Sequence, residues 1–129
     1  MTHDFKRFPE LTNSQMQFYY FDSPHKQIVE GFLGEVVKVT DGDTIRVKWD
    51  ERDFDFPVRL ARIQAPELKA SGGRRSQRFL ENQILGEEVY IGINPDNRTG
   101  KWGRIIGEIN HQGMNLNDMS RDFNYSEKF

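Results

Sequence analysis

The chain has 129 residues, a length that suits one domain with a single modest core. Apolar residues make up 36% of it and charged residues 29%, and no apolar run approaches the roughly 20 residues of a transmembrane helix, which excludes a membrane-spanning protein. The absence of cysteine excludes disulfides, thiolate metal ligands and a thiol nucleophile.

The formal net charge of −2 argues against a uniformly basic nucleic-acid binder, but the charge is distributed unevenly. Residues 59–104 carry a net charge of +4, whereas residues 1–58 carry −4 and residues 105–129 carry −2. This basic centre either attracts phosphate or forms the solvated face of a helix, and the charge pattern alone does not distinguish the two.

Residues 1–28 are rich in aromatic side chains and show no lasting strand or helix period, so we predict an N-terminal extension followed by a domain at 29–129. The aromatic segment "QFYYFDSPHK" contains the turn signal Asp22-Ser23-Pro24. We expect this segment to pack on the domain itself, because an exposed aromatic patch would mark a contact site for a protein partner. The start of the chain lacks the apolar stretch of a secretory signal, so we expect a cytoplasmic location or a place in a larger assembly.

The first elements of the domain are predicted to be strands. Segments 32–40 and 44–49 flank Asp41-Gly42, and this pattern predicts a β-hairpin whose turn uses the positive backbone angles that Gly tolerates. Alternation of apolar and polar residues resumes over 54–60, which predicts a third antiparallel strand with a bulge or an end near Ala61.

A helix and further strands follow. Apolar residues recur at helical spacing within 71–86, which ends at a Gly, and two more strands are predicted within 87–96 and 103–110. Residues 113–125 are compatible with a short final helix. Five antiparallel strands with a helix after the third predict a mainly β fold with helices (α+β), a five-stranded Greek-key barrel of the OB type.

Several polar residues suit phosphodiester hydrolysis, which needs an attacking water, neutralisation of phosphoryl charge and usually a metal. Asp43 follows the hairpin turn and Glu67 follows the third strand, so both carboxylates are expected at neighbouring strand ends. Arg59 and Arg104 supply forked donors that grip phosphate oxygens. Each residue also has an ordinary role open to it: a turn for Asp43, a barrel-wall salt bridge for Arg59, a solvated loop for Glu67.

The order and spacing of these pieces resemble the staphylococcal nuclease-like (thermonuclease) family. The resemblance covers roughly residues 32–120 and rests on "VTDGDTIRV", "VRLARIQAPE", the helix with "RFLENQILG", the strand "EEVYIGI" and "KWGR". An acidic hairpin turn followed by Arg, a Pro-Glu pair, a helix and an aromatic-Gly-Arg triplet is far more specific than any one motif. The resemblance implies an OB-fold barrel and calcium-dependent cleavage of DNA and RNA with low sequence specificity.

The resemblance also implies roles for individual residues. Asp43 would be a calcium ligand, and Glu67 would be the base or orienting group for the attacking water. Arg59 and Arg104 would clamp the phosphate. Nearby support for the site is implied for Asp41 and Thr44.

The chain departs from the family pattern at three positions. Gln64 stands where the family has a second calcium-binding Asp, and its neutral amide oxygen on a longer side chain predicts weaker calcium binding. Ala65 stands where the family often has Thr, which matters less because the implied ligand is the backbone carbonyl. Gly100 stands where the family often has an acidic residue, so a local salt bridge would be loosened.

Two functions therefore stay open. The retained acids and arginines favour an active nuclease, whereas Gln64 is also compatible with a catalytically weakened or inactive module that binds nucleic acid or docks on a protein through residues 1–28. The remaining basic residues either contact nucleic-acid phosphates or lie on solvated helix and loop faces. The Trp among these positions either stacks on a base or packs on the barrel. These positions are Arg74, Arg75, Arg78, Arg98, Lys101 and Trp102.

Overall fold

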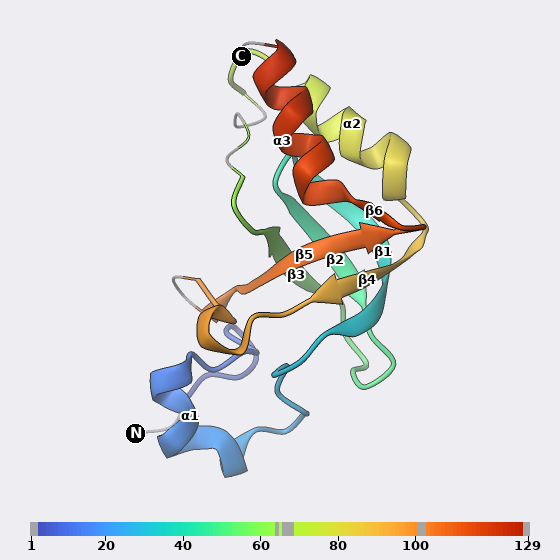
Figure 1. The fold of residues 1–129 in the computed structure, drawn as a ribbon. Coiled ribbons are helices and arrows are strands. Elements are labelled where there is room, and N and C mark those ends of the chain that lie inside the picture. Colours follow the sequence, from blue (N-terminus) through green and yellow to red (C-terminus); the bar gives the residue numbers. More distant parts are fainter. Residues whose placement is uncertain (1–2, 64, 66–68, 101–102, 128–129) are drawn as a thin grey trace.

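A computed structural model describes residues 3–63, 65, 69–100 and 103–127 of the chain. A barrel of short strands lies at its centre, with two helices at one end and the N-terminal segment at the other (Figure 1). The elements in chain order are α1 (Asn13–Tyr19), η1 (Tyr20–Asp22), β1 (Phe32–Asp41), β2 (Thr44–Lys48), β3 (Phe56–Leu60), α2 (Gly73–Ile84), β4 (Glu88–Gly92), η2 (Pro95–Asn97), β5 (Ile105–His111), β6 (Met114–Asn115) and α3 (Leu116–Glu127).

The sheet follows the order β3-β2-β1-β4-β5-β6, and an additional parallel pairing of β3 with β5 closes it. The other neighbours pair antiparallel. The predicted five-stranded barrel with an inserted helix is thus confirmed, including the end of the third strand just before Ala61. The two-residue strand β6 was not predicted, because so short a pairing leaves no alternation in the sequence.

The barrel interior follows the period-2 pattern of the strands. Along β3, Phe56, Val58 and Leu60 are buried, while Pro57 and Arg59 face outward. Helix α2 adds Leu80 and Ile84 to the same core from one side. The outward face of β3 is consequently the surface on which polar side chains are presented.

The β1–β2 hairpin has the predicted location but not the predicted turn chemistry. Gly42 does not adopt a positive φ angle. A Cβ atom on Gly42 would lie 1.9 Å from the Ser76 hydroxyl of α2 and 2.7 Å from the Ala65 methyl. Glycine is required here because α2 and the loop after β3 both approach the turn closely.

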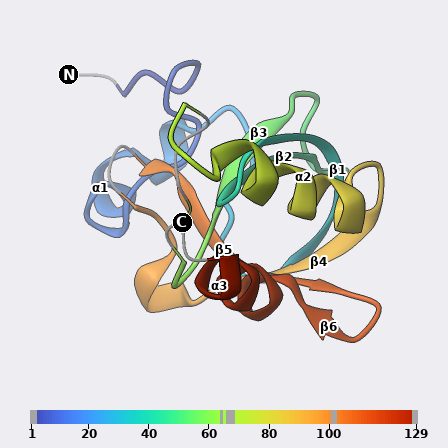
Figure 2. The same ribbon diagram turned by 90° about the horizontal axis from the view of Figure 1, so that it is seen from above.

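Helices α2 and α3 lie side by side at the hairpin end of the barrel (Figures 1 and 2). Phe79 of α2 stacks on Phe123 of α3, with ring centroids 4.4 Å apart and an interplanar angle of 12°. Ser120 of α3 donates a hydrogen bond to the Gly42 carbonyl (3.3 Å). Both helices therefore brace the hairpin turn. Within the described part of the chain, no helix has the length and apolar character needed to cross a bilayer.

The N-terminal segment contains a helix that the sequence did not predict, because α1 has only seven residues. Thr12 caps it through a reciprocal hydrogen-bond pair with Gln15. The expectation that the aromatic cluster packs on the barrel is wrong for its central part: Phe18 is 72% exposed and Phe21 96% exposed. Short helices without a buried face leave their aromatic side chains outside, and the segment is anchored by other residues.

Candidate active site

The hairpin turn and the outward face of β3 bring the first predicted site residues together. Asp43 lies in the turn, Thr44 begins β2, and Thr44 pairs with Arg59 of β3 across the sheet. The backbone of Asp43 accepts a hydrogen bond from the Leu60 N–H (2.8 Å). The turn and the end of β3 are thereby fixed against each other.

The Asp43 carboxylate is held by three neighbours. The Thr44 hydroxyl donates to Oδ1 (3.0 Å), the Ala65 N–H donates to Oδ2 (3.3 Å), and Arg59 Nη2 lies 3.6 Å from Oδ2. Burial opposes the charge of Asp43, but hydrogen bonds involving Asp41 and Ala65 and the charge of Arg59 outweigh it and lower the pKa. Asp43 is therefore an ionised carboxylate in a fixed orientation at neutral pH.

Asp41 faces this carboxylate from the other side of the turn, and its Oδ1 accepts the Asp43 N–H (3.1 Å). Burial and the adjacent Asp43 carboxylate raise the pKa of Asp41. Two carboxylates this close repel each other in the absence of a cation. The pair accordingly fits a hard, oxygen-ligated cation in charge and in ligand type. Among the described residues, no group of three or more His, Cys, Asp or Glu side chains forms a metal cage.

The opposite pKa shifts predict opposite stability effects for two neutralising variants. In chelator at pH 7, Asp43→Asn is expected to lower the free energy of unfolding and Asp41→Asn to raise it, each by less than about 1 kcal/mol because both groups are partly exposed. The Asp43 contribution is present above its unfolded pKa and lost as the pH falls through its lower folded pKa. The Asp41 charge becomes a cost as the pH rises through its raised folded pKa. Urea unfolding at pH 7 and pH 3 measures both effects, and shifts of the same sign at pH 7 would contradict this account.

Arg59 turns its guanidinium toward the acidic turn. Its Nη1 donates to the Leu60 carbonyl (2.8 Å), which fixes the side chain along β3, while Nη2 faces Asp43. The side chain is 27% exposed, so part of its donor edge is open to solvent. In this position Arg59 can pair with Asp43, and its exposed donors can also bind a phosphate.

Arg104 lies on the same outer surface, further from the turn. Ile105 is buried and pairs with Val58 of β3, so Arg104 precedes β5 as an exposed residue. Because Arg59 pairs with Ile106, Arg104 is displaced from Arg59 by two residues, about 7 Å along the strand direction. Arg59 of β3 and Arg104, just before β5, are thus presented on the same outer face of the barrel.

Four predicted site residues lie outside the described residues: Gln64, Glu67, Lys101 and Trp102. Ala65 is the described residue between the first two, and its N–H contacts the Asp43 carboxylate. Gly103 follows the other two and is buried.

The remaining basic positions divide into two groups. Arg74, Arg75 and Arg78 are exposed on α2, the helix whose buried Ser76 approaches Gly42 of the hairpin turn. Arg98 was predicted to contact nucleic-acid phosphates or to lie on a solvated face, and both predictions are wrong because its side chain is only 3% exposed. Its guanidinium donates to the Ile28 carbonyl (2.6 Å) and the Leu11 carbonyl (3.1 Å) of the N-terminal segment.

Several known proteins are similar to the chain in sequence. No model of a known protein family matches the chain. A protein named "Uncharacterized endonuclease" from Escherichia coli is 39% identical over 85 residues, which cover 65% of this chain and 52% of that protein. "Micrococcal nuclease" from Shigella flexneri is 35% identical over 78 residues, or 60% of this chain and 42% of the relative. A Haemophilus influenzae protein, also named "Uncharacterized endonuclease", is 29% identical over 82 residues, covering 64% and 44%.

These similarities to proteins named as endonucleases and as a micrococcal nuclease support a nuclease family of the staphylococcal nuclease type. It spans about half the length of the curated relatives it matches. The barrel closure and the acidic hairpin turn are the parts of this nuclease-like domain that the sequence predicted correctly.

The nuclease-like domain also depends on residues that the sequence analysis missed. Asn117 of α3 is fully buried, donates to the Ala61 carbonyl (2.9 Å) and the Gly107 carbonyl (3.0 Å), and accepts from the Ile109 N–H (2.9 Å). It fixes the start of the loop that leads from β3 to the Pro-Glu motif. Asn in a polar helical segment gave no signal of this role, because the same composition is typical of an exposed surface.

Proposed function

We propose that the chain carries a calcium-dependent nuclease activity that hydrolyses phosphodiester bonds of DNA, RNA or both with low sequence specificity. The observation that carries this proposal is the ionised Asp43 carboxylate beside Arg59, with Nη2 of the arginine 3.6 Å away, on the face that also presents Arg104. The names of the nuclease relatives support it.

The proposed cation ligands are the Asp43 carboxylate, the Gln64 amide oxygen and the Ala65 backbone carbonyl. A bound calcium ion would neutralise phosphoryl charge and lower the pKa of an attacking water. Asp41 and Thr44 support this ligand set, since Thr44 orients Asp43 and Asp41 adds negative charge. The ligand set contains fewer negative charges than one with Asp in place of Gln64.

The arginines are proposed to hold the substrate. Arg59 and Arg104 each offer a planar fork that matches two phosphate oxygens, and Glu67 is proposed to accept a proton from the attacking water or to orient it. Phosphate contacts carry no sequence information, so a clamp of this kind cleaves with little base preference. Single-stranded or frayed nucleic acid exposes its backbone to such an open face most readily.

Cleavage of labelled single-stranded DNA and RNA, followed with and without chelator, tests the proposal. We expect cleavage in calcium, loss of cleavage in excess chelator, and recovery when calcium is restored. Chelator-insensitive cleavage of either substrate would contradict the calcium dependence, and absence of cleavage in every divalent ion tested would contradict the nuclease activity itself.

Gln64→Asp provides a second test, because it adds one negative charge at the proposed ligand position. We expect its calcium dissociation constant to fall by roughly tenfold, since calcium affinity follows the ligand charge count. Isothermal titration calorimetry measures this directly, with Asn82→Asp at an exposed position of α2 as the matched control for an added surface charge. Equal affinities for Gln64→Asp and the wild type would show that residue 64 is not a ligand.

The exposed aromatic side chains favour a second candidate function, that of a docking module. Phe18 and Phe21 project from the N-terminal segment with most of their surface in solvent, and exposed apolar patches tend to mark contact sites. A chain that binds nucleic acid but shows no calcium-stimulated cleavage, and that loses a protein partner on Phe18→Ser/Phe21→Ser, would support this candidate over the nuclease.

A further inference from the structure

The N-terminal segment and the barrel enclose a pocket of about 320 Å³ beside Arg104. Its walls include five cationic side chains and two acidic ones. These residues are Lys6, Arg7, Arg46, Arg52 and Arg104, with Glu10 and Asp55.

Both acids are already occupied by arginines of the pocket. Asp55 accepts a hydrogen bond from Arg46 Nε (2.7 Å), and Glu10 forms a buried ion pair with Arg52. Lys6, Arg7 and Arg104 are exposed and make up the cationic excess of the pocket walls. The pocket is therefore suited to an anion.

Buried charge behind the pocket adds to this excess. Glu10 also lies 3.4 Å from Arg98 Nη2, so one buried carboxylate faces two buried guanidinium groups. Burial, and then the adjacent Arg98 charge, lower the pKa of Arg52 to about 10, which still leaves Arg52 protonated at neutral pH. Its Nε and Nη1 are buried without a hydrogen-bond partner among the described residues. A fixed positive charge in a low-dielectric setting acts strongly on a nearby anion.

Backbone contacts of the N-terminal segment hold the pocket walls in place. The Asp4 carboxylate accepts the N–H groups of Lys6 (3.2 Å) and Arg7 (3.1 Å), which shapes the turn that carries both cations. Gly103 has a φ of 73°, and a Cβ atom there would lie 2.5 Å from the Glu10 carbonyl. The backbone at Glu10, three residues after Arg7, thus lies close to the residue before Arg104.

The pocket continues the candidate active site along the same surface. Thr44 pairs with Arg59 at the site, and Arg46 pairs with Pro57 at the pocket, two residues further along β2 and β3. The separation is about 7 Å, and one strand of B-form DNA carries a phosphate for about every 3.4 Å of helix axis. A strand whose cleaved phosphate lies at Arg59 therefore brings a phosphate within about two nucleotides of it to the pocket.

We propose that the pocket beside Arg104, with Lys6, Arg7 and Arg46 in its walls, binds a second backbone phosphate of the nucleic-acid strand that the candidate active site takes as substrate. This inference rests on the proposed function for the identity of the strand. The N-terminal segment would then take part in substrate binding through the side chains of Lys6 and Arg7.

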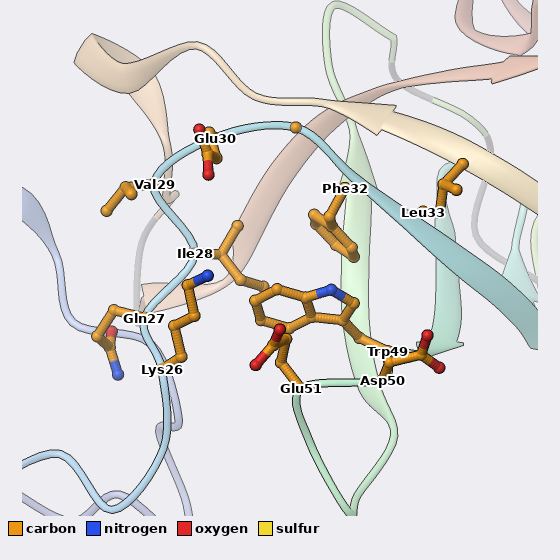
Figure 3. Close-up of a pocket in the computed structure, with 11 residues that line it drawn as sticks. Lys26, Gln27, Ile28, Val29, Glu30, Phe32, Leu33, Trp49, Asp50 and Glu51 are labelled. Atoms are coloured by element: carbon orange, nitrogen blue, oxygen red, sulfur yellow. The ribbon is translucent and has the colours of Figure 1, made fainter.

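A second pocket of about 280 Å³ has the opposite charge (Figure 3). There the Trp49 indole and Lys26 are accompanied by three carboxylates: Glu30, Asp50 and Glu51. Phosphate is repelled from such a surface, so Lys26 provides a control position on the same N-terminal segment.

The test compares Lys6→Gln/Arg7→Gln with the charge-matched control Lys26→Gln/Arg121→Gln, in which both replaced residues are exposed. Binding of a fluorescent 12-nucleotide DNA strand is measured in chelator over a range of salt concentrations. For the first variant we expect a roughly fivefold higher dissociation constant and a log–log salt slope smaller by about 0.7, the loss of one phosphate contact on a single strand. The control is expected to retain the wild-type slope.

Substrate length separates a strand from a free phosphate. A dinucleotide, which has one phosphodiester, should be bound equally by the wild type and Lys6→Gln/Arg7→Gln, whereas inorganic phosphate should compete only weakly with the 12-nucleotide strand. The inference is overturned by an unchanged slope in Lys6→Gln/Arg7→Gln, by an equal loss in the control, by strong competition from inorganic phosphate, or by a wild-type chain that does not bind the strand. Expected binding results without any cleavage would refute the nuclease activity while leaving the phosphate pocket standing.

Discussion

Replacing Glu67 with Ala is expected to lower kcat for cleavage of single-stranded DNA by about 10²–10⁴-fold, the usual contribution of a general base. KM should change little, because the proposed partner of Glu67 is the attacking water and not the bound strand. The N–H of Ala65, two residues earlier, already contacts the Asp43 carboxylate, so the loop that carries Glu67 starts at the proposed cation ligand (3.3 Å).

The control for this variant is Glu88→Ala, which removes an exposed carboxylate from β4. A pH profile of kcat/KM adds an independent readout, since the acidic limb of the wild-type profile should disappear in Glu67→Ala. Retention of more than a tenth of the wild-type kcat, with the acidic limb intact, would assign the proton transfer to another group.

Replacing Glu10 with Gln is expected to lower the free energy of unfolding by about 3–5 kcal/mol, because it removes one partner from a buried charge cluster. Two guanidinium groups, those of Arg52 and Arg98, would then remain buried without a counter-charge. Arg52 additionally lies over the rings of Trp49, Phe54 and Phe56, so it cannot reach solvent without disrupting this aromatic packing.

Chemical unfolding of Glu10→Gln and of Glu30→Gln, an exposed acid just after the N-terminal segment, provides the measurement. Glu30→Gln should stay within about 0.5 kcal/mol of the wild type. A Glu10→Gln variant as stable as Glu30→Gln would mean that the buried cluster does not hold the N-terminal segment on the barrel.

The sequence predicted the barrel well because its strands obey a simple rule. Strands β3, β4 and β5 alternate buried and more exposed residues, and β1 does so up to a register shift after Val36. The reason for Gly42 was wrong, because close approach by Ser76 is a tertiary contact that local sequence cannot reveal. The same limit applies to β6, which exists only through its pairing with β5.

The candidate site was predicted in part for a similar reason. Asp43 comes directly before Thr44 of β2, and Thr44 pairs with Arg59 of β3, so strand pairing places Asp43 close to Arg59. Arg98 was misjudged, because its carboxylate partner Glu10 lies 88 positions away in the sequence. A charged residue in a polar loop looks solvated until the segment that covers it is known. The division of the chain at residue 28 stays a prediction, although Ile28 itself belongs to the barrel core.

The role given to the N-terminal segment follows from this buried cluster. Arg98 binds the carbonyls of Leu11 and Ile28, and its own carbonyl accepts the Ile106 N–H of β5 (2.9 Å). The strand that follows Arg104 is therefore connected to the segment through Arg98. Anchoring of this kind makes the segment part of the surface on which the proposed substrate lies.

Calcium titration of the wild type and Asp43→Asn by isothermal calorimetry tests the central claim most directly, since the account depends on a cation held at the acidic hairpin turn. Asp118→Asn, which neutralises a partly exposed carboxylate on α3, is the control. We predict saturable binding of one calcium ion by the wild type and the control, and no measurable binding by Asp43→Asn. Wild-type calcium affinity in Asp43→Asn would contradict the account.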